Sequence, residues 1–237
     1  MEYFKGLIFR FRYKELRYSY LPLFIMIVFN LFVFYGTRLI TSGGNHFDIT
    51  TEFDAQIPFI PQMIFVYILA YVQWALCFVV ILGDSEGVCH KVYTSEIVAK
   101  FIAMVFFILL PTVMVRPEVS GGAPSSFLLR FIYSVDTPDN LFPSLHCLES
   151  WCCFRGLVMI KHKFKHHTLI CFINYLFTML VFFSVLAVKQ HVILDVVGGV
   201  AVMELGFAIT NAFKADKGMK KLSDALTKRL FKKKAKV

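Results

Sequence analysis

Hydrophobic residues gather in long runs along the chain. The six runs, whose ends are blurred by polar residues, are 19–41, 59–82, 97–115, 142–160, 168–188 and 191–213. A helix needs about 20 mostly apolar residues to cross a bilayer, so each run is a candidate span. The fourth run is the least apolar because it carries Glu149 and Arg155. The pattern predicts an all-α, polytopic membrane protein built as a six-transmembrane-helix bundle.

Composition agrees with this assignment and limits the number of domains. Hydrophobic residues make up 57% of the chain, whereas soluble domains contain roughly 45–50%. A chain of 237 residues leaves no room for a second sizeable domain. We expect a basic, aromatic interfacial segment at 1–18, a membrane domain at 19–213 and a basic tail at 214–237. The first span should stay as an anchor, because the N-terminal segment contains no small-residue cleavage site.

The distribution of lysine and arginine predicts the orientation of the spans. Segments 1–18 and 161–167 are basic, and the tail from Lys214 carries ten Lys and Arg against two Asp. The first loop, SGGNHFDITTEFDAQ, has no Lys or Arg. Six spans place the three basic segments on one side, which the positive-inside rule makes cytoplasmic. Both termini are therefore predicted to be cytoplasmic. The plasma membrane is favoured, because KKKAKV is no KDEL-type retention signal.

The net charge of +9 is local to those segments. It is consistent with attraction to anionic lipid head groups, and equally with a topology signal and a solvated tail. Nucleic acid is not predicted as a partner, because the bases flank spans and form no folded basic face. A metal is not predicted either, since HExxH and carboxylate clusters are absent from the sequence.

Ionisable residues collect at the ends of spans that this topology places on the extracytoplasmic side. They are Arg116, Ser144, His146, Lys189, His191 and Asp195. His191 and Asp195 are four positions apart, so on a helix they would share a face. The Asp195 carboxylate would then accept the Nδ1 hydrogen of His191 and leave Nε2 as a nucleophile or base.

Two histidines with nearby cations suit phosphoryl transfer. One imidazole attacks phosphorus, the other protonates the leaving oxygen, and Arg or Lys neutralises the remaining oxygens. Each residue also has a purely structural interpretation, such as Ser144 as a helix N-cap. A Ser-His-Asp hydrolase is disfavoured, because the GxSxG at residues 83–87 lies in a loop that the predicted topology places on the opposite side of the membrane from these residues.

Two acidic residues inside the predicted spans have several interpretations. Glu149 lies one turn below His146, where it would tune that imidazole, bind a polar head group, or pair with Arg155 or Lys189. Glu204 lies deep in the sixth run, about two and a half turns beyond the predicted site. We expect Glu204 to have a structural role.

At these positions the sequence resembles the type 2 phosphatidic acid phosphatase superfamily. The pattern of that family is KxxxxxxRP, PSGH and SRxxxxxHxxxD. The matching residues here are Arg116-Pro117, then Pro143-Ser144-Leu145-His146, then Ser184, His191 and Asp195. The resemblance covers roughly residues 60–210. It implies a six-helix membrane core and an enzyme that needs no metal or other cofactor.

The resemblance also implies a role for each matching residue. His191 would be the nucleophile that forms a phosphohistidine, and Asp195 would orient it. His146 would be the general acid for the leaving group. Arg116 and Ser144 would hold the phosphoryl oxygens.

Three positions depart from the family pattern and remove two cations of its phosphate clamp. Leu109 replaces the family lysine, Leu145 the family glycine and Val185 the family arginine. The backbone N–H of Leu145 can still donate a hydrogen bond to a phosphoryl oxygen. Lys189 and Arg130 are the predicted substitutes for the missing charges.

The favoured function is a metal-independent phosphatase that hydrolyses a lipid phosphate or polyprenyl diphosphate at the extracytoplasmic face. Its partners would be that substrate and membrane lipids. One alternative is a lipid phosphotransferase, since enzymes resembling sphingomyelin synthase or inositol phosphorylceramide synthase also have altered clamps. A second alternative is a non-catalytic member that binds or transports an anionic lipid.

Overall fold

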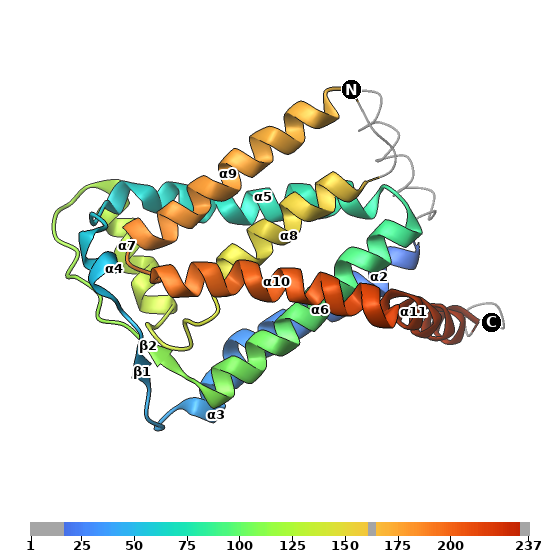
Figure 1. Ribbon diagram of the computed structural model, residues 1–237, viewed down its shortest axis with the longest axis horizontal. Coiled ribbons are helices and arrows are strands. Elements are labelled where there is room, and N and C mark those ends of the chain that lie inside the picture. The colour runs from blue at the N-terminus through green and yellow to red at the C-terminus, as the bar shows by residue number, and fades with distance from the viewer. Residues whose placement is uncertain (1–16, 161–164, 233–237) are drawn as a thin grey trace.

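The computed structural model describes residues 17–160 and 165–232, which are mostly helical. Predictions for residues 1–16, 161–164 and 233–237 lie outside the described residues; they concern the interfacial segment, part of the basic fourth-to-fifth loop and the end of the tail. The long helices run side by side along the long axis of the molecule (Figure 1).

Five helical segments among the described residues are long and apolar enough to cross a membrane. They are α2 (Arg17–Leu31) continued through η1 (Phe32–Gly36) and α3 (Thr37–Thr41), α5 (Ile64–Leu82) with the preceding turn η2 (Pro61–Met63), α6 (Glu86–Leu109), α9 (His167–Ala187) and α10 (Ile193–Phe213). Each overlaps one predicted run, so the helical prediction is confirmed for these five candidate spans.

The predicted fourth span corresponds to α8 (Leu145–Met159), which has 15 residues. It packs against α5, α9 and α10 near the middle of the molecule. It is shorter than the five helical segments above and carries Glu149 and Arg155. The six-span count therefore stays a prediction.

The third helix differs from its prediction at both ends. The sequence placed a loop at 83–96 and a span at 97–115, but α6 begins at Glu86 and ends at Leu109. The charges in this segment suggested a loop. In the structure Thr94, Ser95 and Glu96 are buried between helices. Tertiary packing thus extends the helix through a polar segment.

Short elements gather at one end of the bundle and tie three loops together (Figure 1). They are β1 (Phe47–Asp48), α4 (Glu52–Gln56), β2 (Thr112–Val113) and α7 (Pro124–Val135). Strands β1 and β2 pair in parallel, and Val113 also bridges Asp139. The fold is mostly helical, as predicted, and this small strand pair braces the end of the bundle that carries the candidate site.

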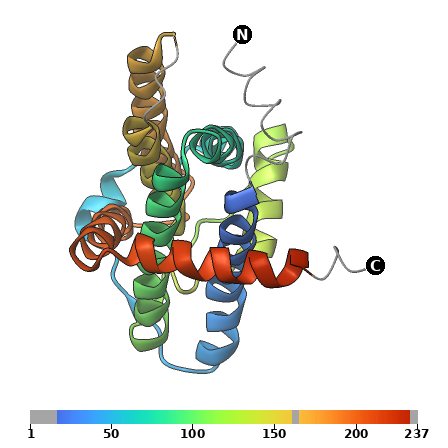
Figure 2. The same cartoon turned by 90° about the vertical axis from the view of Figure 1, so that its right-hand side faces the viewer.

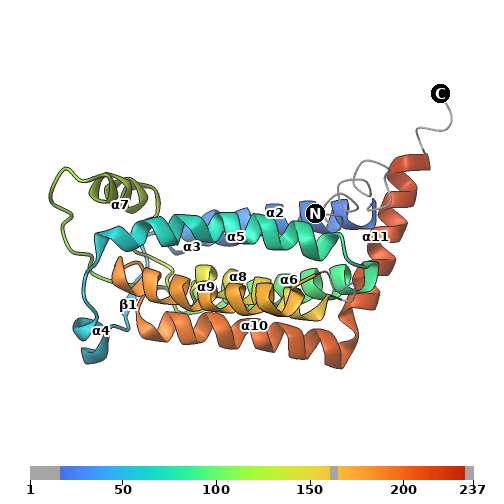
Figure 3. The same ribbon diagram turned by 90° about the horizontal axis from the view of Figure 1, so that it is seen from above.

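The opposite end is crossed by α11 (Ala215–Lys232), which runs at a steep angle to the bundle (Figures 2 and 3). It contacts α6 and α2, and Lys220 Nζ lies 2.5 Å from Glu86 Oε1. The sequence predicted only a basic tail here. The segment is rich in Lys, Ala and Leu, which favour helix, and its docking on α6 orders it.

Close contact between α10 and α8 depends on Gly199. A Cβ at this position would lie 2.5 Å from the carbonyl oxygen of Ser144. We expect Gly199→Ala to lower the free energy of unfolding by about 1–3 kcal/mol, since overpacking forces backbone shifts. Gly218→Ala is the matched control: a Cβ there meets nothing within 4 Å, and alanine should stabilise α11. Thermal unfolding in detergent measures both, and equal effects would contradict the prediction.

Candidate active site

The first histidine of the site, His191, precedes α10 rather than lying on it. The helix begins at Ile193, so the expectation that His191 and Asp195 share a helix face is wrong. A turn brings them together instead, because the Val185 carbonyl accepts hydrogen bonds from the backbone N–H groups of Gln190 and His191. His191 Nδ1 lies 3.2 Å from Asp195 Oδ2. The contact engages Nδ1 and leaves Nε2 to react.

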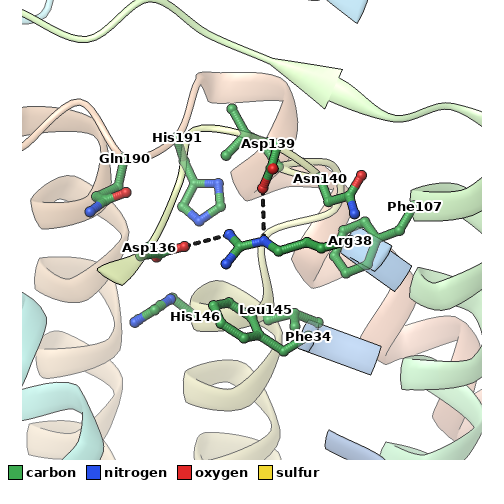
Figure 4. A pocket seen from close by; sticks show the side chains of 11 residues that line it. Phe34, Arg38, Phe107, Asp136, Asp139, Asn140, Leu145, His146, Gln190 and His191 are labelled. Carbon is green, nitrogen blue, oxygen red and sulfur yellow. Dashed lines mark hydrogen bonds and ion pairs between the residues drawn. The ribbon is translucent and has the colours of Figure 1, made fainter. Parts of the chain in front are cut away.

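The second histidine, His146, lies in the first turn of α8. Ser144 caps this helix, since its Oγ accepts a hydrogen bond from Cys147 N at 3.4 Å. The backbone N–H of Ser144 donates to the carbonyl oxygen of Asp195 at 3.0 Å. That bond fixes the two histidine-bearing segments against each other. The rings of His146 and His191 have centroids 6.3 Å apart (Figure 4).

Aromatic packing and one threonine hold His146 in place. Its ring stacks on Tyr67 with centroids 4.2 Å apart. Its Nε2 is buried and has no hydrogen-bond partner among the described residues. The loop before it is fixed by Thr112 Oγ1, which accepts from the backbone N–H groups of Leu141 and Phe142 at 2.9 and 2.8 Å. His146 is thus preorganised with one nitrogen available.

Arg38 is a site residue that the sequence analysis missed. It comes from α3, and its guanidinium pairs with Asp136 and Asp139, each at 2.7 Å. Figure 4 shows it in the pocket beside both histidines. The sequence did contain a signal for this residue, because Arg38 is the sole Lys or Arg in the apolar run 19–41. An ionisable residue within a span is a functional candidate by default.

Two cavities meet at His191. The inner pocket, which contains Arg38 and His146, has a volume of about 30 Å³, room for about two water molecules. The outer cavity is larger, about 360 Å³, and is lined by Arg116 and Lys189 among others. His191 lines both. A ligand in the outer cavity can therefore reach the imidazole, while Arg38 approaches it from the inner side.

Arg116 is held beside the His191 turn. Its Nη1 donates to the carbonyl oxygen of Asp136 at 2.5 Å, and its Nη2 donates to Gln190 Oε1. Its guanidinium lies 4.6 Å from the ring centroid of Tyr133. Burial raises the pKa of Tyr133 to about 12, so its hydroxyl stays protonated and donates to a backbone carbonyl. These contacts fix a cation at the border of the two cavities.

Lys189 lines the outer cavity with its ammonium already hydrogen-bonded. Its Nζ donates to the carbonyl oxygens of Asp54 and Ile57 at 2.9 and 2.7 Å. Its backbone is left-handed, with φ of 53°. Lys189 therefore braces the loop after α4, and it also brings a positive charge to the cavity wall.

The other two predicted phosphate contacts lie in different places. Leu145 lines the inner pocket. Arg130 is exposed on α7 and donates to the carbonyl oxygens of Val119 and Gly121 at 3.1 and 2.9 Å. It lines neither the inner pocket nor the outer cavity. The structure brings Leu145 to the histidines and does not bring Arg130 there.

Asp54 connects α4 to the start of α10. Its Oδ1 accepts a hydrogen bond from Ile193 N at 2.7 Å, and its Oδ2 accepts from the backbone N–H and hydroxyl of Thr51. Burial raises the pKa of Asp54, but these hydrogen bonds and the nearby Lys189 charge outweigh it, so the net pKa is lowered. A carboxylate with a lowered pKa stabilises the fold above its unfolded pKa and loses that contribution as pH falls.

We expect Asp54→Ala to lower the free energy of unfolding by about 1–3 kcal/mol at pH 7, because two backbone donors lose their acceptor. The difference in the free energy of unfolding between the variant and the wild type should shrink below pH 3.8, the ordinary pKa of an aspartate carboxyl, because the Asp54 carboxylate then becomes protonated. Melting temperatures at pH 7 and pH 3 test this. Glu52→Ala, which removes an exposed acid from the same helix, is the control, and a pH-independent difference would contradict the prediction.

Two histidines thus lie close together at one end of a bundle of helices that are long and apolar enough to cross a membrane. The family model described as PAP2 superfamily matches residues 92–218, more than half of the chain. The chain therefore belongs to the PAP2 superfamily, which confirms the resemblance. Members are membrane proteins and generally phosphatase-type enzymes. No curated protein and no solved structure matches the chain significantly.

Some residues of the candidate site lie inside the range that the family model matches, and others lie outside it. It includes Arg116, His146, His191 and Asp195, and it excludes Arg38 and the first span. Among the described residues, no three His, Cys, Asp or Glu side chains are arranged to hold a metal ion. The paired histidines thus come from the family core, and one cation of the pocket comes from outside it.

Proposed function

We propose that the protein is a metal-independent membrane phosphatase that hydrolyses a lipid phosphate or polyprenyl diphosphate. The observation that carries this proposal is the His191 imidazole, held by Asp195 at 3.2 Å and facing His146 across the inner pocket. A nucleophile oriented by a carboxylate, with a second imidazole nearby, is the arrangement that covalent phosphoryl transfer requires.

The reaction has two steps. His191 Nε2 attacks phosphorus, the bond to the leaving oxygen breaks, and His146 donates a proton to that oxygen. A water molecule then gives a proton to His146 and attacks the phosphohistidine, which releases inorganic phosphate and restores His191. Asp195 stabilises the imidazolium that forms during each step.

In this proposal the phosphate clamp consists of Arg116, which the family pattern retains, and Arg38, which replaces one of the two missing cations. Arg116 lies on the side of the outer cavity and Arg38 on the side of the inner pocket, with His191 between them. Two guanidinium groups can stabilise the charge on the phosphoryl oxygens in the transition state. The hydroxyl of Ser144, the backbone N–H of Leu145 and the Lys189 charge complete the phosphate site.

The proposed membrane arrangement has six spans, with α8 as the fourth. The site faces the extracytoplasmic side, because the basic helix α11 lies at the opposite end of the bundle (Figure 3). Both termini are then cytoplasmic, and the plasma membrane is the proposed location. Substrate enters from the outer leaflet through the outer cavity.

The test uses purified protein in detergent with EDTA. Phosphate release is measured from phosphatidic acid, phosphatidylglycerol phosphate and undecaprenyl diphosphate. We expect release from at least one of them. If none is hydrolysed, a labelled phospholipid head group is followed into an alcohol-bearing lipid acceptor, which would instead identify a phosphotransferase. Absence of both activities would point to an anionic-lipid binder and overturn the proposal.

A further inference from the structure

Two charged side chains meet on the outside of the bundle, on a face that α8 and α10 share. Arg155 Nε of α8 lies 2.8 Å from Glu204 Oε1 of α10, and the two side chains are 36% and 41% exposed. The sequence suggested Arg155 or Lys189 as an ion-pair partner of Glu149. That pairing is wrong, because Glu149 pairs with Lys100 at 2.5 Å. Arg155 is left to Glu204 at the surface of the bundle.

This ion pair lies near the middle of a candidate span. Glu204 comes eleven residues after the start of α10 (Ile193–Phe213) and nine residues before its end. At about 1.5 Å per residue, it is roughly 13 Å or more from either end of the helix. The surroundings at that depth of a bilayer are hydrocarbon, in which an exposed charge is costly and marks a functional candidate. A partner other than lipid chains should therefore cover the pair.

Each member of the pair has hydrogen-bonding capacity left over. Glu204 Oε1 also accepts from Trp151 Nε1 at 2.7 Å, but no described residue donates to Oε2. The Arg155 guanidinium lies 5.3 Å from the ring centroid of Phe207, but no described residue accepts a hydrogen bond from its two terminal nitrogens. Donors and acceptors without partners are unfavourable where water is absent. The face thus presents both a donor and an acceptor.

The combination of a donor and an acceptor selects the kind of partner. A lipid chain offers neither group, and a phosphate head group would satisfy Arg155 but be repelled by Glu204. A second copy of this chain offers both groups. Arg155 and Glu204 lie at one depth within the chain, so a twofold axis along the membrane normal keeps them at one depth between two copies. A twofold contact brings the same patch together from both sides.

The surface around Glu204 suits the close packing of two helices. Ala201 and Ala208 lie three residues before it and four residues after it, and both are exposed. Residues at these spacings share a helix face. Val197 and Leu205 of the same helix are 58% and 47% exposed. Small residues let helix backbones approach each other within a membrane, and the apolar side chains beside them can pack against the partner.

We propose that this face of α8 and α10 is the contact surface of a homodimer, in which Arg155 of each chain pairs with Glu204 of the other. Both histidines of the candidate active site come from one chain, so the proposal is independent of the phosphatase reaction. Variants that dissociate should keep the phosphate release of the wild type, and the association can be measured whatever the activity is.

The first test is the mass of the purified full chain in a mild detergent, measured by light scattering and corrected for bound detergent. The chain has a mass of 27.3 kDa, and we expect the wild type to have twice that mass. Ala208→Trp should be monomeric, because a bulky side chain keeps the helices apart. Leu76→Trp is the matched control: it enlarges a 63% exposed side chain on α5 and should stay dimeric.

The second test exchanges the charges and detects pairing between chains. Arg155→Glu leaves two acids at the two positions, and Glu204→Arg leaves two bases. Each variant alone should be monomeric, because like charges would meet. Co-expressed with different affinity tags, the two variants should co-purify at least tenfold better than two copies of either one. A role of the pair within one chain cannot produce this result, since each chain still carries two like charges.

The proposal is overturned if the wild type is monomeric or if Ala208→Trp remains dimeric. It is also overturned if the charge variants, shown to be folded by their melting temperatures, do not co-purify preferentially with each other. If a charge variant does not fold, the masses of the wild type and of Ala208→Trp decide the question, since neither protein has an altered charge.

Discussion

Phosphate release is expected to fall about 10⁴-fold or more when His191 is replaced by glutamine, because the proposed nucleophile is lost. Glutamine keeps a polar side chain of similar length, but its amide cannot attack phosphorus. Values of kcat/KM for wild type and variant, measured with EDTA on the hydrolysed substrate, give the size of the loss. Acid-labile label from a phosphate-labelled substrate should appear on the wild-type protein and not on the variant.

The matched control for this change is His46→Gln. His46 lies in the loop before β1, at the same end of the molecule, and its ring contacts the Gly44 carbonyl. We expect its activity to equal that of the wild type. Retention of most activity in His191→Gln, or an acid-labile label on that variant, would rule out a phosphohistidine at position 191.

Removal of the Arg38 guanidinium should have the second largest effect. We expect Arg38→Met to lower kcat/KM about 10²–10³-fold, mainly through kcat, because the cation acts on charge that develops in the transition state. Arg38→Lys should recover part of the activity, since a lysine keeps the charge but cannot bond in the same planar, forked geometry. Steady-state kinetics of both variants, with melting temperatures measured alongside, test this.

A purely structural role for Arg38 is distinguished by its acidic partner. Arg38 pairs with Asp136 and with the more exposed Asp139, each at 2.7 Å, so the single variant leaves both carboxylates without this cation, and Asp136 is the more buried of the two. The double variant Arg38→Met with Asp136→Asn should regain thermal stability but not activity. Recovery of both would show that Arg38 only neutralises Asp136. Arg155→Met, which removes a guanidinium paired with Glu204, is the control and should keep full activity.

Much of the helical framework could be predicted from the sequence. The run 168–188 corresponds to α9 (His167–Ala187), and the run 191–213 corresponds to α10 (Ile193–Phe213). These boundaries are predictable because hydropathy is a property of consecutive residues. Motif spacing likewise singled out His146, His191 and Asp195, which the fold brings together at one end of the bundle.

Partners from distant segments could not be predicted. Arg38 and Asp136 are 98 positions apart in the chain, and Asp54 and Ile193 are 139 apart. No local pattern relates such residues, because their contact depends on how the helices and loops pack. The same reason explains why Arg130 looked like a clamp residue from its place before the PSLH motif.

By itself, then, the sequence determined that this is a helical membrane protein of the PAP2 type with two histidines and an aspartate at one site. Only the tertiary structure decided which charges face each other: Arg38 beside the histidines, and Lys100 against Glu149. The physical reason is that a buried charge must be matched by whichever opposite charge is nearest in space. Span formation depends on neighbours along the chain, whereas charge matching depends on neighbours across the bundle.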